Sequence, residues 1–179
     1  MSKQILVIST SPRKGGNSDM LAEELIRGAR EAGNDVEKVT LYDKTIGFCK
    51  GCLICQSTQR CVIHDDADTI AQKMLNADVL VFATPIYYYG MSGQMKTMLD
   101  RANPLYSADY RFRDIYLLTA AAEEDEHTPD GAVTGLQGWI DCFEKARLAG
   151  TVFAGGVTSV GEIQGHPALK QAYEMGKQM

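Results

Sequence analysis

The feature that most constrains this chain is a loop rich in hydroxyl groups and glycine, residues 9–18, which lies between an apolar run and an amphipathic run. A buried strand, such a loop and a helix form an anion site, because the first N–H groups of a helix are unpaired and its dipole is positive there. The loop lacks the closing Gly-Lys-Ser/Thr of a Walker A loop and the spaced glycines of a dinucleotide turn. It therefore predicts a site for one terminal phosphate monoester, with an ordinary N-capped helix as the alternative.

The side chains of this loop suit a phosphate. Gly15 and Gly16 allow the backbone to fold tightly around an anion. Arg13 is a better candidate partner than Lys14, because a guanidinium can bind phosphate through two hydrogen bonds. The candidate phosphate-binding residues are Ser9, Ser11, Pro12, Arg13, Asn17 and Ser18.

Composition narrows the class of protein. The chain has 179 residues and a net charge of −5, which predicts one domain and argues against nucleic-acid binding. No apolar run is long enough to span a bilayer and no secretory signal is evident, so we expect a cytoplasmic protein without a membrane role. In that reducing compartment five cysteines do not predict a disulfide framework.

Strand-like and helix-like segments alternate five times along the chain. The pattern predicts an α/β fold with a five-stranded parallel sheet between two layers of helices. Expected strands cover residues 3–9, 35–41, 78–83, 115–120 and 151–157, and expected helices cover residues 17–30, 66–76, 92–102, 132–149 and 167–179. The loops after the first, third and fourth strands should converge at the carboxyl edge of the sheet, where ligands bind in such folds.

Four cysteines form the second informative motif. Cys49, Cys52, Cys55 and Cys61 have the spacing C-x2-C-x2-C-x5-C, and Gly51 permits a sharp turn between the first two. Tandem C-x2-C steps point several sulfurs into one concave loop, as in iron–sulfur sites. Zinc is one alternative, and free thiols or a redox-active disulfide are another. We expect the fifth, Cys142, to be a small core residue on the helix over residues 132–149.

Three segments carry a resemblance to a known family: residues 9–18, Thr84–Gly90, and the stretch from Gln94 to Arg101. They resemble the NADPH-dependent FMN reductase family over nearly the whole chain. With the cysteines included, the sequence is most similar to the iron–sulfur flavoprotein branch of this flavodoxin-like group. The resemblance implies strand order 2-1-3-4-5, a single FMN-binding domain over residues 1–179 with a cysteine-rich insertion at about 42–63, and a [4Fe–4S] cluster on the four cysteines.

The resemblance also implies that the FMN phosphate lies in the loop over residues 9–18 and that the flavin ring lies against the Pro85–Gly90 segment. A flavin needs a flat, mostly apolar pocket, and tyrosines and a close-approaching glycine suit one. Tyrosines packed under a loop are the alternative. The small residues near Ala121 would form a third wall, and the acidic run after them should face solvent. Candidate ring-binding residues are Pro85, Ile86, Tyr87, Tyr88, Tyr89, Gly90 and Ala121.

The function implied is that of an FMN-dependent NAD(P)H oxidoreductase acting on a quinone, a flavin or another small acceptor. The flavin N5 carries this chemistry, so no catalytic side chain is expected. A cluster would add a one-electron outlet and make ferredoxin a candidate partner, and relatives of this kind imply a homodimer or homotetramer. Two other classes stay open: an electron carrier without its own substrate, and an interaction module with structural zinc. Lys96 and Arg101 are expected to form helix-surface ion pairs.

Overall fold

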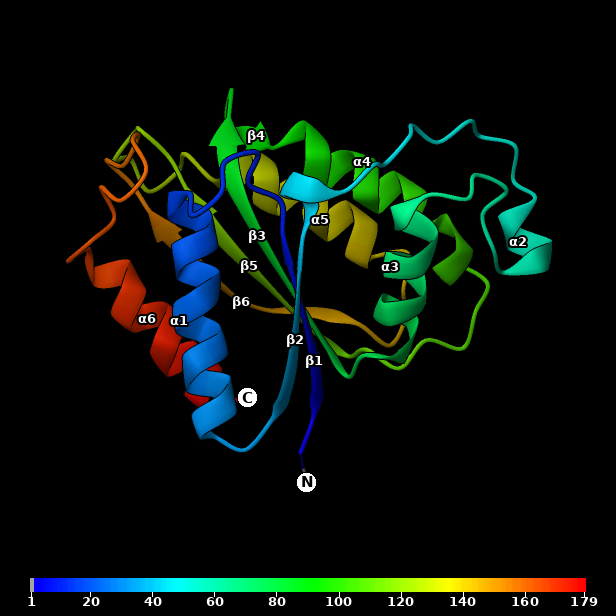
Figure 1. Cartoon of the computed structure of the whole chain (residues 1–179), viewed down its shortest axis with the longest axis horizontal. Coiled ribbons are helices and arrows are strands. Elements are labelled where there is room, and N and C mark those ends of the chain that lie inside the picture. Colours follow the sequence, from blue (N-terminus) through cyan, green and yellow to red (C-terminus); the bar gives the residue numbers. More distant parts are fainter. Residues whose placement is uncertain (1) are drawn as a thin grey trace.

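The computed structural model describes residues 2–179 and contains the predicted parallel sheet (Figure 1). The strand order is β2-β1-β3-β5-β6, and a two-residue strand, β4, pairs antiparallel with the end of β3. Because β5 and β6 are the fourth and fifth predicted strands, this order confirms the flavodoxin-like 2-1-3-4-5 arrangement. The strands are β1 (Gln4–Ser9), β2 (Asp35–Thr40), β3 (Val79–Tyr87), β4 (Gly90–Met91), β5 (Asp114–Ala120) and β6 (Arg147–Ala154).

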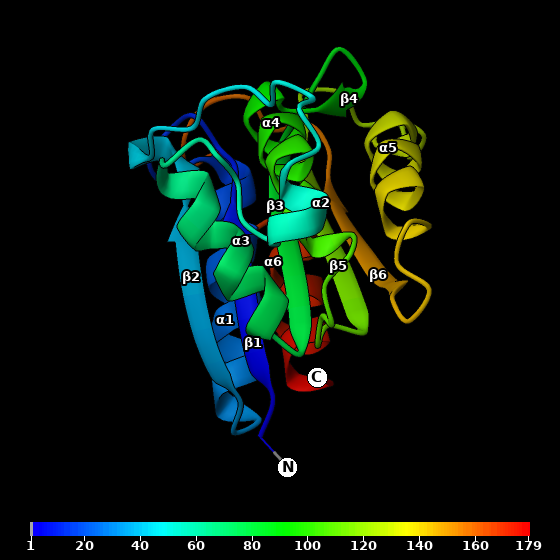
Figure 2. The ribbon, with the colours of Figure 1, turned by 90° about the vertical axis from the view of Figure 1, so that its right-hand side faces the viewer.

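Helices cover both faces of the sheet. α1 and α6 lie on one face, and α3, α4 and α5 lie on the other (Figures 1 and 2). The short helix α2 belongs to a loop that projects beyond α3 (Figure 1). The helices are α1 (Asn17–Glu31), α2 (Cys55–Thr58), α3 (Asp66–Asn76), α4 (Gly93–Arg101), α5 (Asp130–Ile140) and α6 (Pro167–Lys177), with 3-10 turns η1 (Leu41–Asp43) and η2 (Asn103–Leu105).

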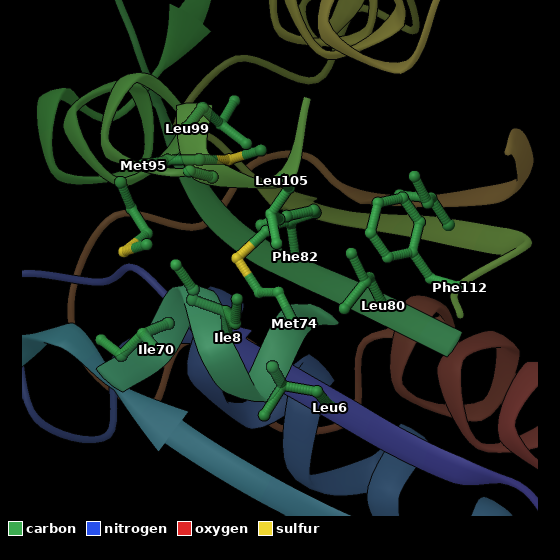
Figure 3. Packing of buried hydrophobic residues seen from close by; sticks show 14 of the residues in the cluster. Leu6, Ile8, Ile70, Met74, Leu80, Phe82, Met95, Leu99, Leu105 and Phe112 are labelled. Atoms are coloured by element: carbon green, nitrogen blue, oxygen red, sulfur yellow. The ribbon is translucent and has the colours of Figure 1, made fainter. Parts of the chain in front are cut away.

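The core consists of two apolar layers, one on each face of the sheet. On the face toward α3 and α4, Ile8 and Phe82 from the central strands pack against Met74 and Met95 (Figure 3). The central strands β1 and β3 are buried almost throughout, as the continuous apolar runs predicted. β2 and β6 lie at the two edges of the sheet, and both contain exposed and half-buried residues as well as buried ones.

The predicted helix over residues 132–149 was too long. α5 ends at Ile140, and the chain then turns through short-range bonds such as that from the Phe143 N–H to the Ile140 carbonyl, 2.8 Å. Trp139 and Phe143 have helical spacing in the sequence, but they contact each other across this turn, with ring centroids 4.5 Å apart. β6 therefore begins at Arg147, four residues before the predicted strand, and ends at Ala154.

α1 and α6 approach each other closely because each has a glycine at the contact. A Cβ on Gly28 would lie 2.1 Å from the Tyr173 carbonyl oxygen, and a Cβ on Gly176 would lie 2.1 Å from the Leu25 carbonyl oxygen. A methyl group at either position has no room unless the helices separate.

We therefore expect Gly28→Ala to lower the free energy of unfolding by about 1–3 kcal/mol, the range for overpacked sites. Gly138→Ala is the matched control, because Gly138 is also helical but a Cβ there would meet no atom within 4 Å. That control should leave stability unchanged or raise it by roughly 0.5–1 kcal/mol. Urea unfolding of both variants measures the difference, and equal stabilities would contradict the close packing.

Candidate functional site

The loops after β1 and β3 meet at the carboxyl edge of the sheet, as predicted. The Thr10 N–H donates to the Ala83 carbonyl at 2.8 Å, and the Thr10 hydroxyl lies 3.1 Å from that of Ser92, the N-cap of α4. The loop after β5 reaches the same edge, since Pro85 of β3 pairs with Ala120 of β5. The start of β1 and the end of α6 lie at the opposite side of the sheet (Figure 1). The chemically rich loops are thus brought together.

The phosphate loop, residues 9–18, leads into a helix with no side-chain cap. Gly16 is the N-cap of α1, and within residues 2–179 no side chain accepts a bond from the first turn as a cap. By contrast, Asp65, Ser92 and His166 cap α3, α4 and α6. The Ser18 hydroxyl is buried and has no hydrogen-bond partner in the described part of the chain. An uncapped helix end beside an unpaired buried hydroxyl favours the anion site over the N-capped alternative.

Several predicted phosphate-binding side chains have partners inside the protein. The Ser9 hydroxyl donates to Asp19 at 2.6 Å, and the Ser11 hydroxyl donates to the Arg13 carbonyl at 2.9 Å. The Asn17 amide donates to the Ser159 carbonyl at 3.0 Å, so it ties this loop to the segment after β6. These three side chains shape the loop, which leaves Ser18 and the backbone amides to face an anion. Pro12 is half-buried, and Arg13 is exposed at the rim of the loop.

The segment after β3 is a tight turn that we call the tyrosine hairpin, residues 86–91. Tyr87 pairs with Gly90, and the two residues between them have positive φ: Tyr88 at 49° and Tyr89 at 62°. Both rings are exposed, so the alternative of tyrosines packed under a loop is wrong for them. Positive φ is unfavourable for a residue with a side chain, and the hairpin is held in this strained turn. It projects from the edge of the sheet (Figure 1).

The start of α5 supports the tyrosine hairpin from one side. A Cβ on Gly131 would lie 2.2 Å from the Tyr89 carbonyl oxygen, so only glycine allows this approach. Ala121 is buried and donates through its backbone to the Ala154 carbonyl at 3.0 Å. The acidic run Glu123–Glu126 faces solvent, as predicted. The third loop therefore contributes a small, buried residue beside the hairpin and a charged outer rim.

All five cysteines line one pocket of about 430 Å³, the cysteine pocket, which lies between the cysteine loop (residues 44–65), α4 and the end of α5. Cys142 is exposed beyond the end of α5 and lines this pocket, so its predicted place in the core was wrong. Trp139 and Phe143 form part of the same wall. Gly51 has a φ of 63°, which confirms the sharp turn predicted between Cys49 and Cys52.

Hydrogen-bond donors reach three of the sulfurs. The Gly51 N–H donates to Cys49 at 3.4 Å and the Asn103 amide donates to Cys55 at 3.1 Å. The Ile63 N–H donates to Cys61 at 3.5 Å. Such donors stabilise sulfur in its ionised or metal-bound form. Among residues 2–179, no three His, Cys, Asp or Glu side chains lie close enough together to hold one metal ion.

Arg101 differs most from its prediction. Lys96 forms the expected helix-surface pair with Asp100, 2.6 Å, but the side chain of Arg101 is completely buried and pairs with Asp65 at 2.7 Å. Burial alone would raise the pKa of Asp65, but bonds from Arg101 and from two backbone N–H groups outweigh it and lower that pKa. The stabilisation is therefore present above the ordinary aspartate pKa and is lost only as pH falls through the lowered value.

Comparison with known proteins agrees with the fold and shows the family. The sequence profile of the NADPH-dependent FMN reductase family matches residues 4–134, and the chain belongs to this family. In none of the described helices is there a stretch both long and apolar enough to cross a bilayer.

Two relatives and one solved structure illustrate the similarity. An iron–sulfur flavoprotein of Methanocaldococcus jannaschii is 38% identical over 102 residues, which are 57% of this chain and 53% of that protein. A Bacillus subtilis protein named as an NAD(P)H-dependent FMN-containing oxidoreductase is 39% identical over 98 residues, 55% of this chain and 51% of that protein. Matched regions thus span about half the length of these relatives.

The solved structure shares the fold. An NAD(P)H:quinone oxidoreductase from Methanothermobacter marburgensis superposes with a TM-score of 0.72 at 16% identity, covering 99% of this chain and 97% of that one. At this identity the likeness shows the common α/β fold.

We expect Tyr89→Gly to raise the free energy of unfolding by about 1 kcal/mol, because glycine removes the penalty of the left-handed backbone. Tyr106→Gly is the matched control: Tyr106 is 56% exposed, close to the 62% of Tyr89, but its φ is −58°. The control should lose roughly 0.5–1 kcal/mol. Urea titrations check both values, and destabilisation by Tyr89→Gly would show that the ring's contacts outweigh the strain.

Proposed function

We propose that this chain is an FMN-dependent NAD(P)H oxidoreductase that also holds an iron–sulfur cluster. The observation that carries the flavin part is the uncapped start of α1 beside the unpaired, buried hydroxyl of Ser18. Membership of the NADPH-dependent FMN reductase family supports the same reading. When bound, FMN supplies hydride acceptance and onward electron transfer, and the protein supplies binding and orientation.

The phosphate loop fits the phosphate of FMN. The Ser18 hydroxyl and the first backbone N–H groups of α1 would hold it, because they are the donors left without protein partners. A Cβ on Gly16 would lie 2.5 Å from the Ser11 oxygen, so the tight loop needs glycine at this position. Arg13 is exposed at the rim, where its charge would contribute through solvent.

The tyrosine hairpin would hold the ring. Pro85 is buried and fixes the end of β3, and Ile86 and Gly90 are half-buried next to it. Tyr87, Tyr88 and Tyr89 are exposed, so they are available to cover an aromatic ligand. Ala121 adds a small neighbour across the edge of the sheet. These residues exclude water from one side of the ring rather than take part in proton transfer.

The cysteine pocket has the donor set of an iron–sulfur cluster. Cys49, Cys52, Cys55 and Cys61 line one pocket of about 430 Å³, and four thiolates are the ligands that such clusters take. The names of several relatives, iron–sulfur flavoprotein among them, support this assignment.

A second copy of the chain is the partner that we propose for the exposed aromatic residues of the tyrosine hairpin. Large exposed apolar side chains at a ligand-binding edge are typical of interfaces. Within the hairpin, Tyr88 and Tyr89 are both more than half exposed. Light scattering of the purified protein tests this, and a monomer at micromolar concentration would contradict it.

The experiment to make first measures FMN, iron and acid-labile sulfide per chain on protein purified without oxygen. One FMN beside four irons supports the whole proposal. FMN without iron supports a flavin reductase with free or redox-active thiols. NAD(P)H oxidation with a quinone then separates an enzyme from an electron carrier, since a carrier turns over very slowly. Absence of both FMN and iron after reconstitution would overturn the proposal.

Replacing Ser18 tests the phosphate loop. We expect Ser18→Ala to raise the Kd for FMN about tenfold to a hundredfold, because a hydrogen bond to a charged group is worth roughly 1.5–3 kcal/mol. Quenching of FMN fluorescence by apoprotein measures the Kd. Ser107→Ala is the control, since its exposed hydroxyl donates to the Gln56 carbonyl in the cysteine loop. Equal Kd values for the two variants would rule out Ser18 as a phosphate ligand.

The five cysteines of one pocket allow a matched test of the cluster. We expect Cys55→Ser to lose most of the bound iron, because a hydroxyl is a poor ligand for iron in such clusters. Cys142→Ser removes a thiol from the same pocket outside the four-cysteine motif and should keep the iron of the unmodified protein. Iron and sulfide analysis gives the answer, and loss of iron in both variants would make Cys142 a ligand.

A further inference from the structure

Arg101 is a buried cation at the end of α4. Its Nη1 and Nη2 donate to the two carboxylate oxygens of Asp65, at 2.7 and 2.8 Å. The same two nitrogens donate to the carbonyls of Gly47, 2.7 Å, and Ile63, 3.0 Å. The planar guanidinium thus makes four hydrogen bonds through two nitrogens. The single ammonium nitrogen of lysine cannot reproduce this pattern.

These four bonds close the cysteine loop at its base. Gly47 lies near the start of the loop, and Ile63 and Asp65 lie at its end. Asp65 also accepts from the Gly47 N–H at 2.8 Å and caps α3 through the Ala67 N–H at 3.1 Å. One ion pair therefore joins both ends of the loop to α3 and α4.

The guanidinium is fully buried, and its Nε atom has no hydrogen-bond partner among the described residues. Its charge is balanced by Asp65, which accepts from both terminal nitrogens. The ion pair therefore acts on the cysteine loop through its hydrogen bonds rather than through a net charge.

We propose that Arg101 is a positioning residue for the cysteine pocket: it holds both ends of the cysteine loop together and so keeps the four thiols in place. Closure of the loop is a property of the protein alone, and only its effect on a bound cluster rests on the proposed function.

The first test uses apoprotein and needs no cluster. A lysine-specific protease cleaves after the exposed Lys50 in the cysteine loop. We expect Arg101→Gln to be cleaved there about tenfold faster, because one charge-assisted hydrogen bond corresponds to a factor of this size. The rate of cleavage after Lys177 in the same sample serves as the reference. Arg60→Gln is the matched control, because Arg60 is an exposed cation of the same loop that pairs with Asp68 at 2.7 Å. An unchanged rate in Arg101→Gln would overturn the closure.

A second variant keeps this test valid if the unpaired charge of Asp65 destabilises Arg101→Gln. Asp65→Asn combined with Arg101→Gln leaves two neutral groups that can still hydrogen bond. The double variant should fold, as checked by circular dichroism, and should still be cleaved faster than the unmodified protein. Arg101→Lys keeps the positive charge but lacks the two parallel donors of the guanidinium, so it should also be cleaved faster. Slow cleavage in the folded double variant would show that other contacts close the loop.

The second test measures how fast a chelator removes iron from the reconstituted protein. We expect the folded double variant to lose iron about tenfold faster than the unmodified protein, because its thiols are no longer held in place. Lys50→Gln is the control, since Lys50 lines the same pocket but is exposed. Equal rates in the double variant and the unmodified protein would overturn the positioning of the thiols.

The two tests separate failure of this inference from failure of the proposed function. Unmodified protein that holds no iron would end the cluster assignment while the proteolysis result still decides loop closure. Iron-containing protein whose rates of iron release and cleavage do not respond to Arg101 would overturn the positioning role and leave the oxidoreductase proposal in place.

Discussion

The site depends on a small network of buried hydroxyl groups where β1 and β3 end. Thr10 donates to the Ala83 carbonyl at 3.0 Å and meets the Ser92 hydroxyl, while the Ser92 N–H donates to the Thr84 hydroxyl at 3.0 Å. All three hydroxyl residues are fully buried. A buried polar group without a partner is costly, so these residues hold one another in one arrangement. That arrangement fixes the phosphate loop, the tyrosine hairpin and the start of α4 together.

α4 carries this constraint to the cysteine pocket. Its N-cap, Ser92, belongs to the hydroxyl network, and its last residue, Arg101, holds the cysteine loop. Nine residues of helix span about 13.5 Å at 1.5 Å per residue. The two candidate cofactor sites are thus connected by one short helix anchored at both ends, and neither can move far without the other. This is a geometry that suits electron transfer between them.

The sequence patterns predicted the sheet because its determinants are local. Continuous apolar runs identify the buried strands, and the polar loop after β1 leads into α1 as its pattern predicted. The predictions are wrong where residues far apart in the sequence determine the burial of a side chain or the end of a helix. Nothing near Arg101 in the sequence shows that Asp65, thirty-six residues earlier, buries it. The spacing of Trp139 and Phe143 is helical although the helix ends between them, and that end is what brings Cys142 into the cysteine pocket.

The tyrosine hairpin is a second place where the local sequence does not predict the conformation. Two-residue turns with positive φ are usually signalled by Asn-Gly or Asp-Gly, and this turn has Tyr88 and Tyr89. The pairing of β3 with β4 and the support from Gly131 impose a conformation that the turn residues do not favour. The residues at this position therefore reflect a requirement other than folding.

The two ends of the cysteine loop lie close together, so the loop is a separable part of the fold. The Thr45 N–H donates to Asp66 at 2.7 Å, so the chain enters and leaves the loop at nearly one point. No strand of the described sheet belongs to the segment between them. A short turn from Thr45 to Asp66 could thus replace all four clustered thiols without changing a strand or the phosphate loop. In such an architecture, the difference between a flavin reductase and an iron–sulfur flavoprotein is confined to one exchangeable loop.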